Sequence, residues 1–134
     1  MKRIISLSLL VLSFSAFAAD ADTSTQPMSD ILGVKNIFKC QGVDPLLKQE
    51  YSGLITISKN GDVYNLQMDY DTGEKSIGTG ILKDRTLSVI FKDANNASNT
   101  GVQLYVITDH NKRLEGDWVY LGRNSIGKET CVKK

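Results

Sequence analysis

Apolar and polar residues alternate along most of the chain, in short runs that turn residues separate. In the run 63–70, tyrosine, leucine and methionine side chains occupy one face, while asparagine, glutamine and aspartate occupy the other. Asn60-Gly61 directly precedes this run, and this dipeptide is the strongest short signal for a two-residue β-hairpin. The pattern therefore predicts two antiparallel strands joined by a tight turn at Asn60-Gly61.

The same reading predicts eight strands, most of which begin about 11–13 residues apart, a spacing typical of an antiparallel sandwich or barrel. Their expected ranges are 34–40, 51–58, 63–70, 74–82, 86–92, 101–108, 114–121 and 125–132. Short sequential connections favour an up-and-down arrangement over a more complex topology. Glycines recur inside the predicted strands at 53, 78, 80, 116 and 127. Because such glycines let strands coil tightly and leave room for large neighbours, we predict an all-β fold: one small antiparallel up-and-down β-barrel over residues 34–134.

The first eighteen residues have the features of a secretory signal peptide. Lys2 and Arg3 precede an apolar stretch over 4–17, and Ala16-Phe17-Ala18 matches an A-x-A cleavage site. The stretch is shorter than the roughly 20 residues that a spanning helix needs, although an uncleaved N-terminal anchor is the alternative. We predict a signal peptide over 1–18, a flexible polar segment over 19–33, and a periplasmic or secreted protein of bacterial type.

Composition and charge place the chain among ordinary globular proteins. It has 134 residues, of which 41% are hydrophobic and 23% charged, which suits one domain. The 16 basic and 15 acidic residues nearly balance, so no strong field selects nucleic acid or an anionic membrane surface. We therefore expect no nucleic-acid partner and no stable membrane insertion.

Cys40 and Cys131 are the only cysteines in the sequence. An exported chain folds in an oxidising compartment, where two cysteines allow one intramolecular pairing. We predict a Cys40–Cys131 disulfide that ties the start of the folded region to its end. Two free buried thiols or an intermolecular bridge are the alternatives.

Residues for catalysis or metal binding are scarce. The only histidine, His110, lies in a polar turn-like segment, so neither a Ser/His/Asp triad nor a His-activated cysteine can be assembled. The sequence also lacks the spacing of a calcium loop or a dinucleotide fingerprint. We therefore predict a protein that is not an enzyme and that needs no metal or cofactor.

Glu129 is the one acidic residue expected to point inward, since period two places it on the face of Gly127 and Cys131. It could anchor a ligand in a cavity or be a structural charge at the barrel mouth, unless the register differs by one residue. The candidate cavity combines it with Tyr64, Met68, Tyr105 and Trp118. The alternative for these large side chains, and for Tyr70 and Tyr120, is an ordinary core.

Glycine and large apolar residues recur in a fixed order along the predicted strands, in the motifs Tyr51-x-Gly53, Gly61-x-x-Tyr64-x-Leu66, Gly78-x-Gly80-Ile81, Leu87-x-Val89, Gly101-Val102-x-x-Tyr105-x-Ile107, Leu114-x-Gly116-x-Trp118 and Gly127-x-Glu129. This order resembles small exported bacterial proteins described as fibronectin-binding proteins. The resemblance runs from about Tyr51 to Glu129, although Met68 and Asp69 stand where a tryptophan is expected. It implies a compact β-barrel that acts by binding.

The leading hypothesis is an exported binding protein that recognises a protein partner, by resemblance a fibronectin-like matrix protein. Strand edges or the polar loop near 93–100 would supply the contact surface. A carrier of a small apolar ligand is the second hypothesis, and the expected shape is similar to avidin-like and lipocalin-like barrels. Biotin is not the expected ligand, because Trp118 is the only tryptophan. A periplasmic lysozyme inhibitor is the third, although the Ser-Gly-x-x-Tyr element of such inhibitors is missing.

Overall fold

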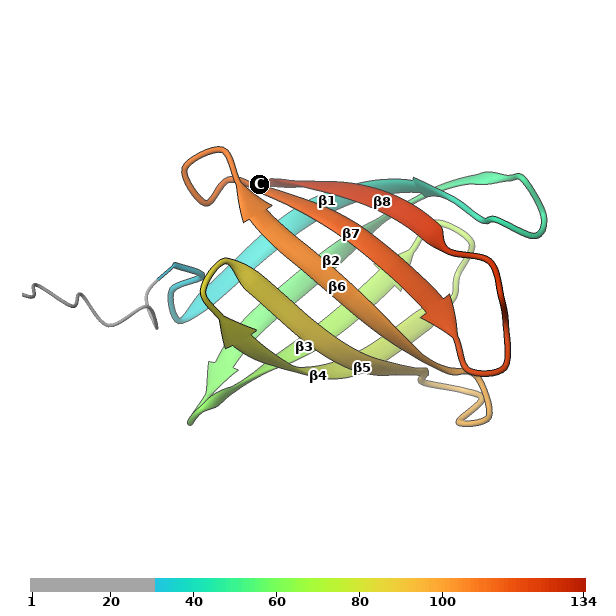
Figure 1. The fold of residues 1–134 in the computed structure, drawn as a ribbon, viewed down its shortest axis with the longest axis horizontal. Helices are drawn as coiled ribbons and strands as arrows, with labels where there is room; N and C mark the ends of the chain where they lie inside the picture. The colour runs from blue at the N-terminus through green and yellow to red at the C-terminus, as the bar shows by residue number, and fades with distance from the viewer. Residues whose placement is uncertain (1–30) are drawn as a thin grey trace, which may run out of the picture.

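The computed structural model describes residues 31–134, so the predicted signal peptide and most of the segment 19–33 lie outside the described residues. Within these residues, eight antiparallel strands follow one another in sequence order (Figure 1). No helix within residues 31–134 has the length and apolar character needed to cross a membrane. The strands are β1 (Lys35–Val43), β2 (Glu50–Asn60), β3 (Val63–Tyr70), β4 (Lys75–Lys83), β5 (Thr86–Asp93), β6 (Thr100–Thr108), β7 (Arg113–Tyr120) and β8 (Gly127–Lys133).

The sheet closes on itself, because each strand pairs with the next and β8 pairs with β1. This confirms the predicted up-and-down barrel. The strand bounds differ from the prediction mainly at three places. β1 extends three residues further toward the β1–β2 loop, β2 is longer at both ends, and β8 begins at Gly127 because Ser125 and Ile126 lie in the preceding loop.

Alternation along each strand sends one set of side chains into the barrel. The resulting core is apolar over most of its length and includes Phe38, Ile55, Ile57, Leu66 and Leu87. Interior glycines make room for the largest rings. A Cβ at Gly127 would lie 2.1 Å from the Trp118 ring, and one at Gly101 would lie 2.4 Å from Phe91.

The two ends of the barrel differ. At one end, on the left in Figure 1, lie the hairpins 61–62, 84–85 and 109–112 together with the first described residues. There Leu32 is only 1% exposed and Ile31 packs against the same core, so the end of the segment expected to be flexible contributes to the fold. We call this the closed end. At the opposite end, which we call the mouth, lie the loops 44–49, 71–74, 94–99 and 121–126.

Cys40 and Cys131 form a disulfide, as predicted, and the bond joins residues that face each other across the β1–β8 pair. Both half-cystines are fully buried in the barrel interior. The bond therefore links the first strand to the last at the point where the sheet closes. It is consistent with a protein that folds outside the cytoplasm.

Candidate functional site

A buried carboxylate lies between the apolar core and the mouth. The structure confirms that Glu129 points inward from β8, and only 4% of this residue is exposed. Its Oε1 accepts a hydrogen bond from Gln103 Nε2 at 2.6 Å and another from the Tyr105 hydroxyl. Its Oε2 accepts one from the Tyr51 hydroxyl at 3.0 Å. Three strands, β2, β6 and β8, therefore converge on one charge, and all three of these donors are uncharged side chains.

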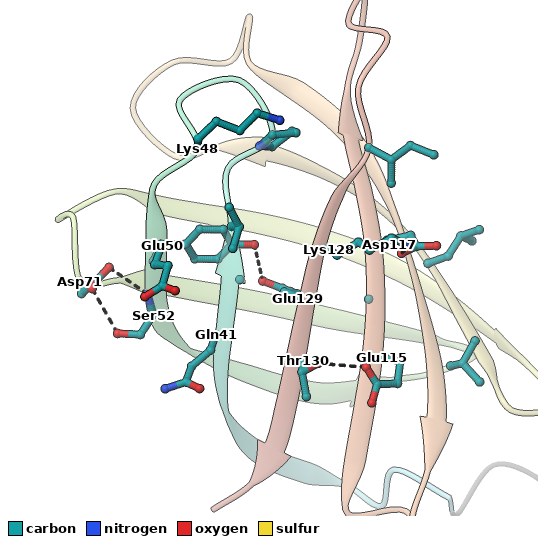
Figure 2. Close-up of a pocket in the computed structure, with 18 of the residues that line it drawn as sticks. Gln41, Lys48, Glu50, Ser52, Asp71, Glu115, Asp117, Lys128, Glu129 and Thr130 are labelled. Carbon is teal, nitrogen blue, oxygen red and sulfur yellow. Dashed lines mark hydrogen bonds and ion pairs between the residues drawn. The ribbon is translucent and has the colours of Figure 1, made fainter.

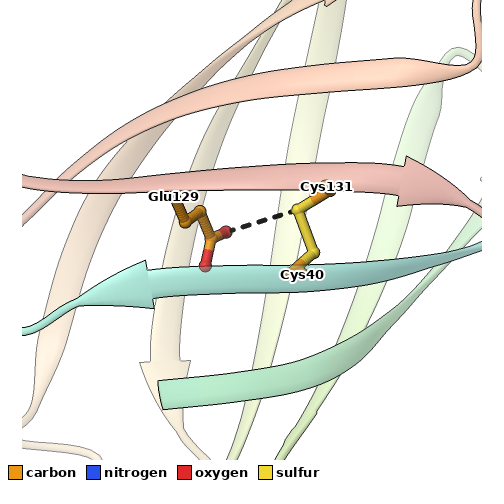
Figure 3. Close-up of side chains that lie close together, drawn as sticks. All are labelled: Cys40, Glu129 and Cys131. Carbon is orange, nitrogen blue, oxygen red and sulfur yellow. Dashed lines mark hydrogen bonds between the residues drawn. A yellow bond between two sulfur atoms is a disulfide. The ribbon is translucent and has the colours of Figure 1, made fainter. Parts of the chain in front are cut away.

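Glu129 also touches the disulfide (Figure 3). Its Oε1 lies 3.9 Å from Cys131 Sγ, and since a disulfide sulfur has no hydrogen to donate, this is a polar contact beside the carboxylate. Cys40, Glu129 and Cys131 are the one grouping of potential metal ligands found among residues 31–134. Because the two sulfurs are bonded to each other, they offer no thiolate to a metal.

Burial and hydrogen bonding act on Glu129 in opposite directions. Burial raises the pKa of its carboxyl above the ordinary value, while the hydrogen bonds from Tyr105, Tyr51 and Gln103 pull the pKa back down. Burial, followed by the nearby charge of Glu129, raises the pKa of the Tyr105 and Tyr51 hydroxyls far above their ordinary range. Both phenols therefore remain protonated donors at physiological pH.

A directed pair of hydrogen bonds connects Glu129 with the mouth. Trp118 Nε1 donates to the Tyr51 oxygen at 2.9 Å, and an indole N–H can only donate. The Tyr51 proton therefore points to Glu129, which fixes the direction of both bonds. Through Tyr51, the buried charge holds the Trp118 ring in place.

Above this network, five aromatic rings form a layer across the barrel. Tyr51 contacts Tyr70 edge-to-face, with ring centroids 5.5 Å apart, and Trp118 at 6.4 Å. Tyr120 contacts Trp118 at 5.4 Å and Phe91 at 5.6 Å, again edge-to-face. Because neighbouring rings are steeply inclined to one another, their faces point in several directions and enclose space between them.

That space is a cavity of about 130 Å³ at the mouth. All five rings of the aromatic layer line it, together with buried Ser76 and Gln103 and residues of the mouth loops. Its charged lining residues are Asp44, Glu50 and Glu74, and no Lys, Arg or His of the described chain lines it. The mouth cavity is therefore aromatic at its walls and acidic at its rim.

The β1–β2 loop forms one side of the mouth cavity, and its own hydrogen bonds shape it. The Asp44 carboxylate accepts from the backbone N–H groups of Leu46 and Leu47 at 2.8 and 2.9 Å. The Asp44 backbone N–H donates to the Gln49 carbonyl at 2.8 Å, which closes the loop at its base. These bonds hold Leu47 and Gln49 beside the cavity, where both contribute to its lining.

A second, wider depression lies mainly along the outer wall over β1, β2, β7 and β8 (Figure 2). Its polar side chains are largely paired with one another. Lys128 lies 2.8 Å from Asp117, and the Thr130 hydroxyl donates to Glu115 at 2.9 Å. Glu115 and Asp117 thus point outward as the alternation predicts, and each is paired with a side chain of the neighbouring strand β8.

The predicted candidate cavity does not exist as one enclosed space. Trp118 alone of its five residues lines the mouth cavity, while Met68, Tyr105 and Glu129 lie among the buried residues. Tyr64 is buried near the start of β3, toward the closed end. The prediction placed these side chains on the correct, inward face of the sheet. It did not separate the residues at the mouth from those deeper along the barrel axis.

Tyr51 and Gln103 are the two donors to Glu129 that the prediction omitted. Tyr51 is an even number of positions from Ile55 and Ile57 on the same strand, so the alternation places it on their inward face, which was a usable signal. Gln103 lies on the same face of β6 as Tyr105. This strand is apolar on both faces, so its sequence did not show which face points into the barrel.

No protein-family model matches the chain, and no relative was found among curated proteins. The fold nevertheless defines a class, the small closed up-and-down β-barrels. The function must therefore be argued from the mouth cavity and the network beneath it.

Proposed function

We propose that the protein is an exported, non-catalytic binding barrel whose mouth cavity holds a compact ligand group. The observation that carries this proposal is the cavity of about 130 Å³ walled by five aromatic rings. Ligand sites are concave, rich in aromatic side chains and supplied with a few polar groups, and they occur in the mouths of β-barrels. The disulfide and the signal-peptide pattern both support a location outside the cytoplasm.

The size of the mouth cavity limits the ligand. Pockets for drug-sized molecules measure roughly 300–1,000 Å³, so about 130 Å³ accepts one small group. The barrel beneath is filled by its apolar core. This favours a small molecule or one side chain of a larger partner over a long apolar ligand buried inside the barrel.

Glu129 prepares the site without facing the ligand itself. Both of its oxygens accept hydrogen bonds from the protein, and it does not line the mouth cavity. Its role is to fix Tyr51, and through it Trp118, before a ligand arrives. Such preorganisation raises affinity because fewer side chains lose freedom on binding.

Trp118 makes the proposal directly testable, because it is the only tryptophan in the sequence and it lines the mouth cavity. The purified, oxidised protein would be titrated with small cationic, neutral and anionic compounds while fluorescence and thermal melting are recorded. At least one class should change the fluorescence saturably and raise the melting temperature.

A matched pair of variants locates the binding. Ser76→Leu places bulk in the mouth cavity, whereas Ser88→Leu places it on the outer face of β5. Binding should be lost in the first variant and kept in the second. If no compound of any charge binds, or if both variants bind equally, the cavity is not a ligand site.

A protein partner is a second candidate, because the outer wall of the barrel carries exposed apolar side chains. Ile77, Ile90, Val102 and Leu104 of β4, β5 and β6 are all exposed. Since the described sheet is closed, such a partner would contact this wall or the mouth loops instead of a free strand edge.

The test is binding of the oxidised protein to immobilised fibronectin, with a second matrix protein as control. Saturable binding to fibronectin alone, abolished by Val102→Lys but not by Asp62→Asn in a closed-end hairpin, would support recognition through the outer wall. Absence of binding at tens of micromolar would refute fibronectin as the partner.

A further inference from the structure

We propose that the mouth cavity selects a compact organic cation, specifically a methylated ammonium group. This inference rests on the proposed function, since it names the ligand class of the same site. Three independent features of the mouth support it: the ring faces, the charge of the rim, and the charge buried beneath.

The aromatic layer suits a cation that has no hydrogen to donate. The face of an aromatic ring is electronegative, and ring faces attract cations most strongly for tryptophan, followed by tyrosine and phenylalanine. The mouth cavity combines Trp118 with three tyrosines and Phe91. Since a methylated ammonium spreads its charge over its methyl groups, several inclined rings can contact it at once.

The rim adds negative charge on the same side of the barrel. Asp44, Glu50 and Glu74 line the mouth cavity without a basic residue of the described chain among its lining. Lys48 lies in the same loop as Asp44, but it lines the outer groove. An anionic ligand would therefore meet repulsion where a cation meets attraction.

The negative charges around the mouth also raise the pKa of the tyrosine hydroxyls that line the cavity. Burial raises the pKa of Tyr120 first, and the charges of Glu74, Asp93 and Asp44 raise it further. The pKa of Tyr70 is raised mainly by burial and then by the charge of Glu129, with a contribution from Glu74. Carboxylates from several loops and strands thus act together on the rings that line the cavity.

Glu129 supplies the third feature. The side chains that donate to it, Tyr51, Tyr105 and Gln103, are uncharged, so these hydrogen bonds bring no opposite charge. Tyr51 and Gln103 line the mouth cavity as well. A cation in the cavity would therefore sit one side chain away from a buried carboxylate and would serve as its counterion.

The first experiment compares choline with 3,3-dimethylbutan-1-ol, which has the same shape but carries no charge. Trp118 fluorescence and calorimetry of the purified, oxidised protein would follow both titrations at constant ionic strength. Choline should bind saturably, and the neutral alcohol should bind roughly three- to thirtyfold more weakly because cation–π attraction is lost.

Substitutions then separate the charge from the shape. Glu74→Gln should weaken choline binding about twofold to fivefold and leave binding of the alcohol unchanged. Asp62→Asn, which removes one negative charge in a closed-end hairpin, is the matched control and should change neither. Tyr120→Leu keeps apolar bulk at the mouth but removes a ring face, so it should weaken choline binding by roughly two- to thirtyfold.

The outcomes distinguish the two proposals. Equal affinity for choline and the alcohol, or tighter binding of a neutral or anionic compound, would overturn the cation selectivity while the ligand site itself stands. Choline binding that survives both Glu74→Gln and Tyr120→Leu unchanged would overturn the assigned site. Failure of every compound, whatever its charge, would overturn the binding function together with this inference.

Discussion

Replacing Glu129 by leucine tests whether the buried carboxylate holds the upper part of the barrel together. Leucine fills much of the same space but accepts no hydrogen bond. The donors of Gln103, Tyr105 and Tyr51 would therefore lose their acceptor in one step. Because these donors come from two other strands, β2 and β6, the change should be felt across the interior.

The expected cost can be worked out from burial. Gln103 is 2% exposed and Tyr105 is fully buried, whereas Tyr51 at the mouth is half-buried and can find water. Two buried donors without a partner cost about 1–3 kcal/mol each, or about 2–6 kcal/mol together. Removing a charge that burial disfavours offsets part of this, so we expect a net loss of about 2–4 kcal/mol at neutral pH.

Urea unfolding followed by circular dichroism would measure this loss. Glu115→Leu is the control, because Glu115 is exposed on the neighbouring strand β7 and should cost no more than about 1 kcal/mol. A Glu129→Leu protein as stable as the unchanged protein would refute the reasoning. So would an equal loss in both variants, because the effect would then not depend on burial.

Three further predictions follow from the interior. Burial raises the folded-state pKa of Glu129 above 4.5, so ionisation of this carboxyl costs the folded protein free energy. The free energy of unfolding should therefore fall as the pH rises from about 4.5 through the folded-state pKa. Urea unfolding at several pH values should show this fall, and Glu129→Gln should abolish it. The Cys40→Ser/Cys131→Ser variant should lose about 4–5 kcal/mol in guanidinium unfolding, and a loss below about 1 kcal/mol would contradict the loop-closure argument. Gly127→Ala should displace the Trp118 ring, changing its emission maximum and costing about 1–3 kcal/mol, and an unchanged spectrum would contradict the predicted displacement.

Most strands could be predicted because they combine a clear alternation with a recognisable turn. The predicted run 63–70 has the same bounds as β3, and the Asn60-Gly61 hairpin stands directly before it. β6 shows where alternation alone fails, since it is apolar on both faces. Its inward face becomes clear only from its pairing with β7, where Gln103 faces Trp118 and Tyr105 faces Gly116.

Depth along the barrel could not be predicted from the same pattern. Alternation indicates whether a side chain points in or out, but strand tilt and stagger decide which side chains share a level. Tyr64 and Trp118 both point inward, yet only Trp118 lines the mouth cavity. Leu32 was missed for another reason, because the short apolar pair Ile31-Leu32 before the first strand shows no alternation that would reveal which residue is buried.

The pairing of β1 with β8 makes the barrel a ring in which the position of the chain break is almost arbitrary. Lys134 donates its backbone N–H to the Ile37 carbonyl, so the last residue lies beside the first strand at the closed end. In a circular permutant, a short linker could therefore connect the end of β8 to the start of β1. The new chain ends would lie in the hairpin 84–85, so the mouth loops stay intact. In that chain Cys40 and Cys131 would be close in sequence. The same disulfide would then restrict the unfolded chain less and contribute less stability, although the folded barrel around it is unchanged.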